Sequence, residues 1–87
     1  MKLPTSQQVA ICVGAEIREA RLNSTGMSQE DLAEEADLDP STPSLHERGA
    51  RCPTLWSLIN YCLVMRVDPA GMIEGTMKRL KANKWVD

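Results

Sequence analysis

The chain has 87 residues, of which 43% are hydrophobic and 25% are charged, the balance of an ordinary globular domain. This length supports one small hydrophobic core, and the composition excludes an intrinsically disordered chain. Ten basic against twelve acidic residues give a formal charge of −2, which argues against the strongly basic surface of many nucleic-acid binders.

Targeting and metal-binding signals are missing from the sequence. No stretch approaches the roughly 18 apolar residues of a membrane span, and the first residues lack the apolar centre of a signal peptide. We therefore expect a cytoplasmic protein with no membrane partner.

The cysteines Cys12, Cys52 and Cys62 are odd in number and widely spaced, and His46 is the only histidine. This pattern favours reduced thiols, with no disulfide framework, metal site or cofactor.

Apolar residues spaced three or four apart predict an amphipathic first helix over the stretch from Thr5 to Asn23. This helix stops in a turn-forming cluster before Gly26, which can take the left-handed conformation that ends helices. A second helix is predicted to begin at Ser28, whose hydroxyl can accept hydrogen bonds from free backbone donors, and to run to about Ala36.

The third predicted helix is short, and two starting points are open. Asp39-Pro40 is typical of a cap followed by a first-position proline. If Ser41 is the cap instead, Pro43 falls in the first turn, where its missing N–H is tolerated, and the helix becomes shorter. In both cases the helix ends at Gly49, and only a tight turn separates it from the second helix.

A fourth helix follows Cys52-Pro53-Thr54, and its apolar residues surround most of its circumference, which predicts a buried central helix. Asp68-Pro69 repeats the pattern of a cap followed by proline and starts a fifth helix, which fades over residues 81–84. No strand-like alternation occurs, so the predicted fold class is all-α.

The second and third helices, with Ser-Gln at the start of one and Glu-Arg-Gly at the end of the other, form a helix-turn-helix signature. Over residues 13–73 the chain resembles the Cro/phage-repressor (XRE-type) helix-turn-helix regulators. The matching residues are Gly14, Ile17-Arg18, Arg21, Gly26-Met27-Ser28-Gln29, Leu32-Ala33, Ser41-Thr42, Glu47-Arg48-Gly49, Pro53, Leu58 and Val67-Asp68-Pro69. The resemblance implies a compact five-helix, lambda-repressor-like domain, with residues 1–12 as an extension continuing into the first helix and 74–87 as a C-terminal helical extension.

The resemblance also implies that the third helix enters the major groove of DNA while the second lies over the backbone. It assigns phosphate contacts to Gln29, Arg48 and Arg51. The positions facing the bases include Ser41, Thr42, Ser44 and Leu45. Arg21 and Glu47 occupy positions where the family commonly has a buried, structural ion pair.

Two departures lower the expected sequence specificity. The third helix has none of the Arg, Lys, Asn or Gln side chains that make bidentate contacts with bases. The segment from Met27 through Glu47 contains seven acids and no Lys or Arg, and DNA phosphates would repel such a surface unless the acids point away. Glu30, Glu34 and Asp37 share one helical stripe, so they can lie on the solvent side.

Pro43 and His46 stand where the resemblance implies apolar residues, and Leu45 stands where it implies a polar one. We expect His46 to be a partly buried, hydrogen-bonded histidine rather than a pH sensor or ligand.

Beyond residue 73, Met77, Leu80 and Trp85 continue an apolar stripe that either packs into the core or forms a twofold dimer contact. The leading hypothesis is a non-enzymatic transcription regulator that binds double-stranded DNA as a homodimer. The alternative is a helix-turn-helix fold kept as a protein-interaction module, such as an antitoxin or anti-activator, that contacts a protein partner through its acidic helices, Leu45 and Trp85.

Overall fold

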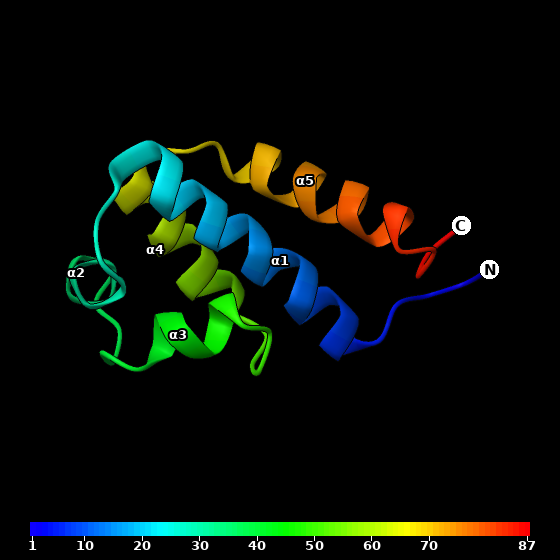
Figure 1. Ribbon diagram of the computed structural model, residues 1–87, viewed down its shortest axis with the longest axis horizontal. Helices are drawn as coiled ribbons and strands as arrows, with labels where there is room; N and C mark the ends of the chain where they lie inside the picture. The colour runs from blue at the N-terminus through cyan, green and yellow to red at the C-terminus, as the bar shows by residue number, and fades with distance from the viewer.

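The computed structural model describes residues 1–87 and contains five α-helices and no strand (Figure 1). The helices are α1 (Ser6–Ala20), α2 (Gln29–Glu35), α3 (Thr42–Glu47), α4 (Leu55–Met65) and α5 (Pro69–Ala82). A π-helical turn, η1 (Arg21–Thr25), prolongs α1. The predicted all-α, five-helix fold is confirmed. No helix combines the length and the hydropathy needed to cross a bilayer.

Helix α1 is the central element, with α5 along one side of it and α3 along another (Figure 1). Its start is fixed by a capping box, in which Thr5 Oγ1 accepts from the Gln8 backbone N–H at 3.1 Å and Gln8 Oε1 accepts from the Thr5 N–H at 3.0 Å. The helical path does not stop at Asn23, as the sequence predicts, but continues as η1 to Gly26 at φ 68°.

One core cluster joins all the main helices except α3. Val13 and Ile17 come from α1 and Met72 from α5, and they meet residues of α2 and α4. The other members are Leu32, Ala36, Leu58, Tyr61, Cys62 and Met65. Since fully burying one large aliphatic side chain contributes about 1.5–3 kcal/mol, burial of this cluster makes a large favourable contribution to the free energy of folding.

An ionic contact holds α5 against α1. The Arg79 guanidinium donates from Nε to Glu16 at 2.5 Å and from Nη2 to Glu19 at 2.6 Å. At the far end of these helices the chain termini meet, where the Lys2 backbone N–H donates to the Asp87 carboxylate at 3.0 Å.

The prediction that α4 is buried all round is wrong. Only one side of α4, which carries Leu58, Tyr61, Cys62 and Met65, packs into the core. The other side is exposed because α2, η1 and α5, which contact α4, do not cover Leu55, Ile59 and Leu63.

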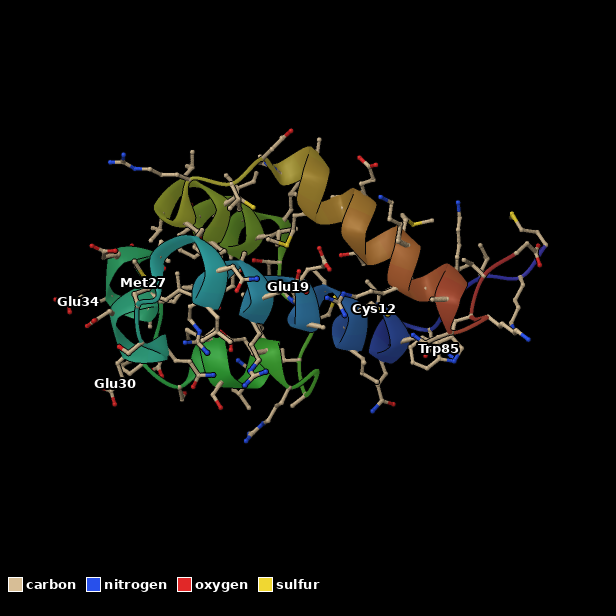
Figure 2. All side chains as sticks on the ribbon, turned by 45° about the horizontal axis from the view of Figure 1, so that its top comes forward. Cys12, Glu19, Met27, Glu30, Glu34 and Trp85 are labelled. Atoms are coloured by element: carbon tan, nitrogen blue, oxygen red, sulfur yellow. The ribbon has the colours of Figure 1, made fainter.

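The apolar stripe of α5 divides in a similar way. Leu80 is 2% exposed within the single chain, so it belongs to the core and is not free for a dimer contact. Met77 is exposed and Trp85 is half-buried, at the end of the molecule where the termini meet (Figure 2).

Candidate nucleic-acid interface

The candidate interface is built from α2, α3 and the turn between them. Ser28 caps α2 by accepting from the Asp31 N–H at 3.1 Å. The chain then reverses at Asp37, which adopts φ 61°, and the Leu38 N–H donates to the Ala33 carbonyl at 2.8 Å. This left-handed residue makes the connection tight, because it turns the chain immediately after the last turn of α2.

Helix α3 begins at the later of the two predicted starts, with Ser41 at the N-cap position. The Ser41 hydroxyl and backbone N–H both donate to Asp39 Oδ1, at 2.7 and 3.0 Å. These two hydrogen bonds lower the pKa of the Asp39 carboxyl, and the nearby charge of Arg51 adds a smaller effect in the same direction. Pro43 lies in the first turn, where no N–H is needed, and its ring is fully buried. It therefore fills the apolar core position of α3.

Arg21 and Glu47 lock α3 to the end of α1. Arg21 donates to Glu47 from Nε at 2.8 Å and from Nη2 at 2.9 Å, and both side chains are buried. The remaining guanidinium nitrogen Nη1 donates to the Met27 carbonyl at 3.0 Å, just before α2. Hydrogen bonding to Glu47 raises the pKa of Arg21 despite its burial. The pair therefore fixes the relative positions of α1, α2 and α3.

Gln29 joins the same network. Its side-chain amide Nε2 donates to Glu47 Oε1 at 3.1 Å, and the residue is half-buried. An amide nitrogen carries two hydrogens, so one remains for a phosphate oxygen. Sequence reasoning placed Gln29 at the interface but missed its contact with Glu47, which joins the start of α2 to the end of α3.

The other predicted contact residues line the outer side of α3 and the turn that follows it. Ser41, Arg48 and Arg51 are exposed, whereas Thr42, Ser44 and Leu45 are half-buried. The two arginines flank a turn in which Gly49 adopts φ 73° and the Ala50 N–H donates to the Leu45 carbonyl at 3.0 Å.

Arg51 extends its influence along α3. Its charge lowers the pKa of Asp39 at the start of the helix and that of His46 near the end. Two positive charges, those of the exposed Arg48 and Arg51, lie at the turn after α3.

The inner side of α3 carries His46, which is 3% exposed. Its Nδ1 lies 2.7 Å from the Tyr61 hydroxyl of α4, and the two rings meet edge to face. Burial is the main cause that lowers the pKa of His46, followed by the charge of Arg51. The expected hydrogen bond of His46 is confirmed, but the side chain is fully rather than partly buried.

The acids of α2 point outward. Figure 2 shows Glu30 and Glu34 directed into solvent from the end of the molecule formed by α2. Asp31, Glu35 and Asp37 are exposed as well. The predicted solvated acidic stripe is confirmed.

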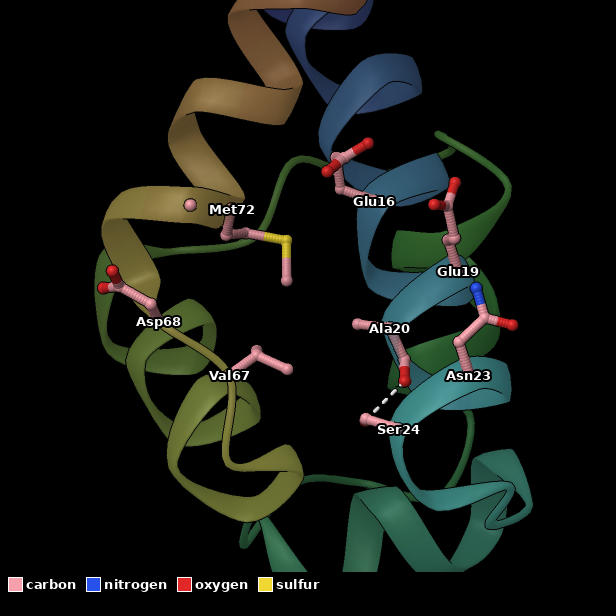
Figure 3. A pocket seen from close by; sticks show the side chains of 9 residues that line it. Glu16, Glu19, Ala20, Asn23, Ser24, Val67, Asp68 and Met72 are labelled. Atoms are coloured by element: carbon pink, nitrogen blue, oxygen red, sulfur yellow. Dashed lines mark hydrogen bonds between the residues drawn. The ribbon is translucent and has the colours of Figure 1, made fainter.

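A groove of about 370 Å³ lies between the end of α1 and the start of α5 (Figure 3). Its carboxylates are already engaged, because Glu16 and Glu19 bind Arg79 and Asp68 caps α5 by accepting from the Ala70 N–H. No cluster of three or more His, Cys, Asp or Glu side chains is placed to hold a metal ion. The groove therefore belongs to the α1–α5 packing.

No family model and no curated protein matches the chain. Solved structures do match. The clp gene regulator ClgR from Corynebacterium glutamicum superimposes with a TM-score of 0.80 at 21% identity, over 87% of this chain and 80% of ClgR. At this identity the match shows the fold alone.

Two restriction-modification controller proteins are more similar in sequence. C.AhdI from Aeromonas hydrophila is 30% identical, with a TM-score of 0.67 over 72% of this chain and 94% of C.AhdI. A point mutant of C.Esp1396I is 32% identical, with a TM-score of 0.74 over 83% of this chain and 95% of that protein. Sequence identity and near-complete coverage of these relatives agree with the helix-turn-helix geometry, and the chain belongs to the Cro/phage-repressor (XRE-type) helix-turn-helix regulators.

Proposed function

We propose that this protein is a transcription regulator that binds double-stranded DNA with α3 in the major groove. The observation that carries the proposal is the rigid α2–turn–α3 unit, in which Glu47 receives hydrogen bonds from both Arg21 and Gln29. Such rigidity supports DNA binding because a recognition helix must reach the groove in one fixed orientation.

Arg48, Arg51 and Gln29 hold the protein on the phosphate backbone. The two arginines are exposed at the turn after α3, and Gln29 retains a free amide hydrogen at the start of α2. Phosphate contacts of this kind set register and orientation without reading sequence.

Base reading falls to the short side chains of Ser41, Thr42, Ser44 and Leu45. Hydroxyl groups donate to several bases, and the Thr42 methyl or Leu45 can meet a thymine methyl. The Ser41 hydroxyl is partly committed to Asp39. We therefore expect modest discrimination between operators, and a homodimer on an inverted repeat would add specificity by reading two half-sites.

A salt-dependent binding titration tests the proposal. The protein is titrated against a labelled random duplex and against the DNA upstream of its own gene, at about 50 and 200 mM salt. We expect tighter binding to the upstream DNA and a steep loss of affinity with salt. Arg48→Ala and Arg51→Ala should each weaken binding to both DNAs and reduce the salt slope by about one.

Lys78→Ala is the matched control, because Lys78 is an exposed cation on α5, remote from α3, and it pairs only with Glu74. It should leave both affinities unchanged. Absence of binding to either DNA at low salt would overturn the proposal and favour the protein-interaction module. The exposed acids of α2 are the observation that supports that second function.

A further inference from the structure

A groove of about 280 Å³ lies at the end of the molecule where the chain termini meet. Three segments line it with apolar side chains: Leu3 comes from the N-terminal segment, Met77 and Leu80 from α5, and Val86 from the segment after α5. Figure 1 shows this end opposite α2, and none of the lining residues belongs to α2, α3 or the turn after α3. We call this groove the terminal groove.

The wall of the terminal groove that contains Val86 is fixed by the way α5 ends. Lys84 adopts φ 59°, a left-handed conformation of the kind that ends helices, and the Trp85 N–H donates to the Leu80 carbonyl at 3.0 Å. This turn places Val86 beside the helix that it follows. The wall is therefore a folded part of the domain.

Hydrogen bonds tie this wall to the N-terminal segment. The Lys2 backbone N–H donates to the Asp87 carboxylate at 3.0 Å, and the Lys2 ammonium donates to the Lys84 carbonyl. Pro4, whose ring restricts φ, joins the segment to the start of α1. Segments from the two ends of the chain thus enclose an apolar space that neither forms alone.

Positive charge predominates around the terminal groove. Lys2 and Lys81 line it, and Asp87 is the only acidic side chain among the lining residues. The Asp87 carboxylate already accepts from the Lys2 backbone, whereas Lys81 is exposed and forms no salt bridge. An ammonium carries three hydrogens, so Lys2 also retains donors after its bond to the Lys84 carbonyl. Cations beside an apolar groove favour a ligand with an anionic head group and an apolar body.

We propose that the terminal groove binds a medium-chain alkyl carboxylate, with its chain along Met77 and Leu80 and its carboxylate beside Lys81. The volume lies just below the roughly 300–1,000 Å³ of most small-molecule sites. At about 30 Å³ for a group the size of a water molecule, it suits a chain of roughly eight to ten carbons.

Apolar surface left open in the terminal groove provides the driving force for binding. Leu3 is 71% exposed and Met77 is 41% exposed, so a bound alkyl chain would remove apolar surface from water. The proposed ligand site does not depend on the proposed function, because its residues lie outside the α2–turn–α3 unit. It would remain if the protein bound no DNA.

Two-dimensional NMR of the full chain, with no residues added at either end, tests the site with octanoate as the probe. We expect saturable shifts of the amide resonances of Leu3, Met77, Leu80 and Val86. Titration to about 10 mM would detect even millimolar affinity. Each further buried methylene should tighten binding, by up to about fourfold, from hexanoate through octanoate to decanoate.

Two further ligands keep the octyl chain and change only the head group. Octylammonium carries a positive charge, which Lys2 and Lys81 would repel, so it should bind at least about tenfold more weakly than octanoate. Octanol is neutral, so its affinity should lie between the two. This order would show that the charge of the head group is recognised.

Variants of α5 separate the contribution of the head group from that of the chain. Lys81→Gln should weaken octanoate binding several-fold and leave octanol binding unchanged. Lys78→Gln is the matched control, because Lys78 is exposed on the same helix outside the groove, and it should bind both ligands as wild type does. Met77→Gln should weaken both ligands alike, whereas Ile73→Gln, at a similarly exposed apolar residue outside the groove, should not. Thermal melts establish that the variants are folded.

Three results in these titrations overturn the inference. They are the absence of saturable shifts with octanoate, equal affinity for octanoate and octylammonium, and shifts that map to the exposed side of α4 instead of the terminal groove. Sedimentation with phosphatidylglycerol vesicles distinguishes a free ligand from a membrane surface. We expect the protein to remain in the supernatant, and cosedimentation would assign the groove to an anionic membrane surface and overturn the inference as well.

Discussion

At the residue scale, Glu47 is the point where three elements meet. Its two carboxylate oxygens accept two hydrogen bonds from Arg21 and one from Gln29, while Arg21 also binds the Met27 carbonyl. A carboxylate so far removed from water is stabilised only while its partners stay in place. The orientation of α3 therefore depends on one side chain at its end.

Glu47→Gln should lower the free energy of unfolding by about 3 kcal/mol or more, because it leaves the Arg21 guanidinium buried beside a neutral amide. Chemical denaturation followed by circular dichroism measures this change. The double variant Arg21→Met/Glu47→Leu should recover much of the loss, since it removes both buried charges.

The matched control for this change is Glu74→Gln. Glu74 pairs with Lys78 at 3.8 Å on the open surface of α5, and both side chains are at least 70% exposed. Exposed pairs of this kind contribute about 0–1 kcal/mol, so the control should unfold almost as wild type does. Equal effects of the two substitutions would show that the Arg21–Glu47 pair does not hold α3.

His46 gives the fold a dependence on pH. Its pKa is lowered in the folded protein, by burial first and by Arg51 second, so the unfolded chain binds the proton more tightly. The contribution of His46 to stability is therefore complete above the unfolded pKa of about 6.5 and is lost as pH falls through the lower folded pKa.

As the pH is lowered from about 7.5 to 5, we expect the free energy of unfolding to decrease. One titrating proton can lower it by at most ~1.4 kcal/mol per pH unit. His46→Gln keeps a hydrogen-bonding group near the Tyr61 hydroxyl but does not titrate, so its stability should vary less over this window. Denaturation curves at matched pH values measure both slopes. Parallel slopes for the two proteins would assign the dependence to other groups.

At the scale of single elements, the contact between α1 and α3 requires the absence of a side chain at Gly14. A Cβ at this position would lie 2.2 Å from the His46 carbonyl oxygen and 2.9 Å from that of Glu47. Both atoms belong to the backbone of α3, so they cannot move without shifting the helix. Gly14 thus sets how closely the recognition helix approaches α1.

Gly14→Ala should destabilise the fold by about 1–3 kcal/mol or more, since the added methyl overpacks a backbone contact. Gly71→Ala provides a control of opposite sign, because its Cβ on α5 would meet nothing closer than 3.9 Å. An alanine there should add about 0.5–1 kcal/mol of stability through better helix propensity. Thermal melts of the two variants should therefore move in opposite directions, and a shared direction would contradict this account.

Helix boundaries can be predicted from the sequence where the residues that cap the helix are its own neighbours along the chain. Ser28, Thr54 and Asp68 cap helices through local hydrogen bonds, so their positions can be read from the sequence. The sequence leaves two possible caps for α3, Asp39 and Ser41. It does not decide between them, because the decision depends on whether the Pro43 ring fits into the core. The hydrogen bond from the Ser41 hydroxyl to Asp39 is local, but the turn that it forms is an alternative to a helix that begins at Asp39.

At the scale of the whole molecule, the sequence does not predict which sides of a helix are buried, because burial depends on how the other helices pack against it. The apolar circumference of α4 predicts burial, but periodicity does not tell which sides of the helix the rest of the chain covers. The same limit applies to Leu80, whose burial depends on how α5 lies against α1. Helix-turn-helix geometry was predictable because family resemblance carries it, whereas the free side of α4 is visible only in three dimensions.

The distribution of charge also becomes clear only at this scale. A net charge of −2 is spread so that the acids of α2 face solvent at one end, while Arg48 and Arg51 stand beside α3. The net charge is unfavourable for binding the DNA polyanion, but the electrostatic potential at the proposed contact surface depends on the charges nearest to it. Protein electrostatics here are decided by position rather than by count.

The π-helical turn η1 has a consequence for chain length. Its wide ring, closed by the Gly26 N–H donating to the Arg21 carbonyl at 2.8 Å, holds one more residue than an α-helical turn would. Removing one residue from this turn would restore α-helical winding and rotate everything after it by roughly 100° relative to α1. A deletion of a single residue at this point would therefore change where α2 leaves α1, without altering any of the residues proposed to contact DNA.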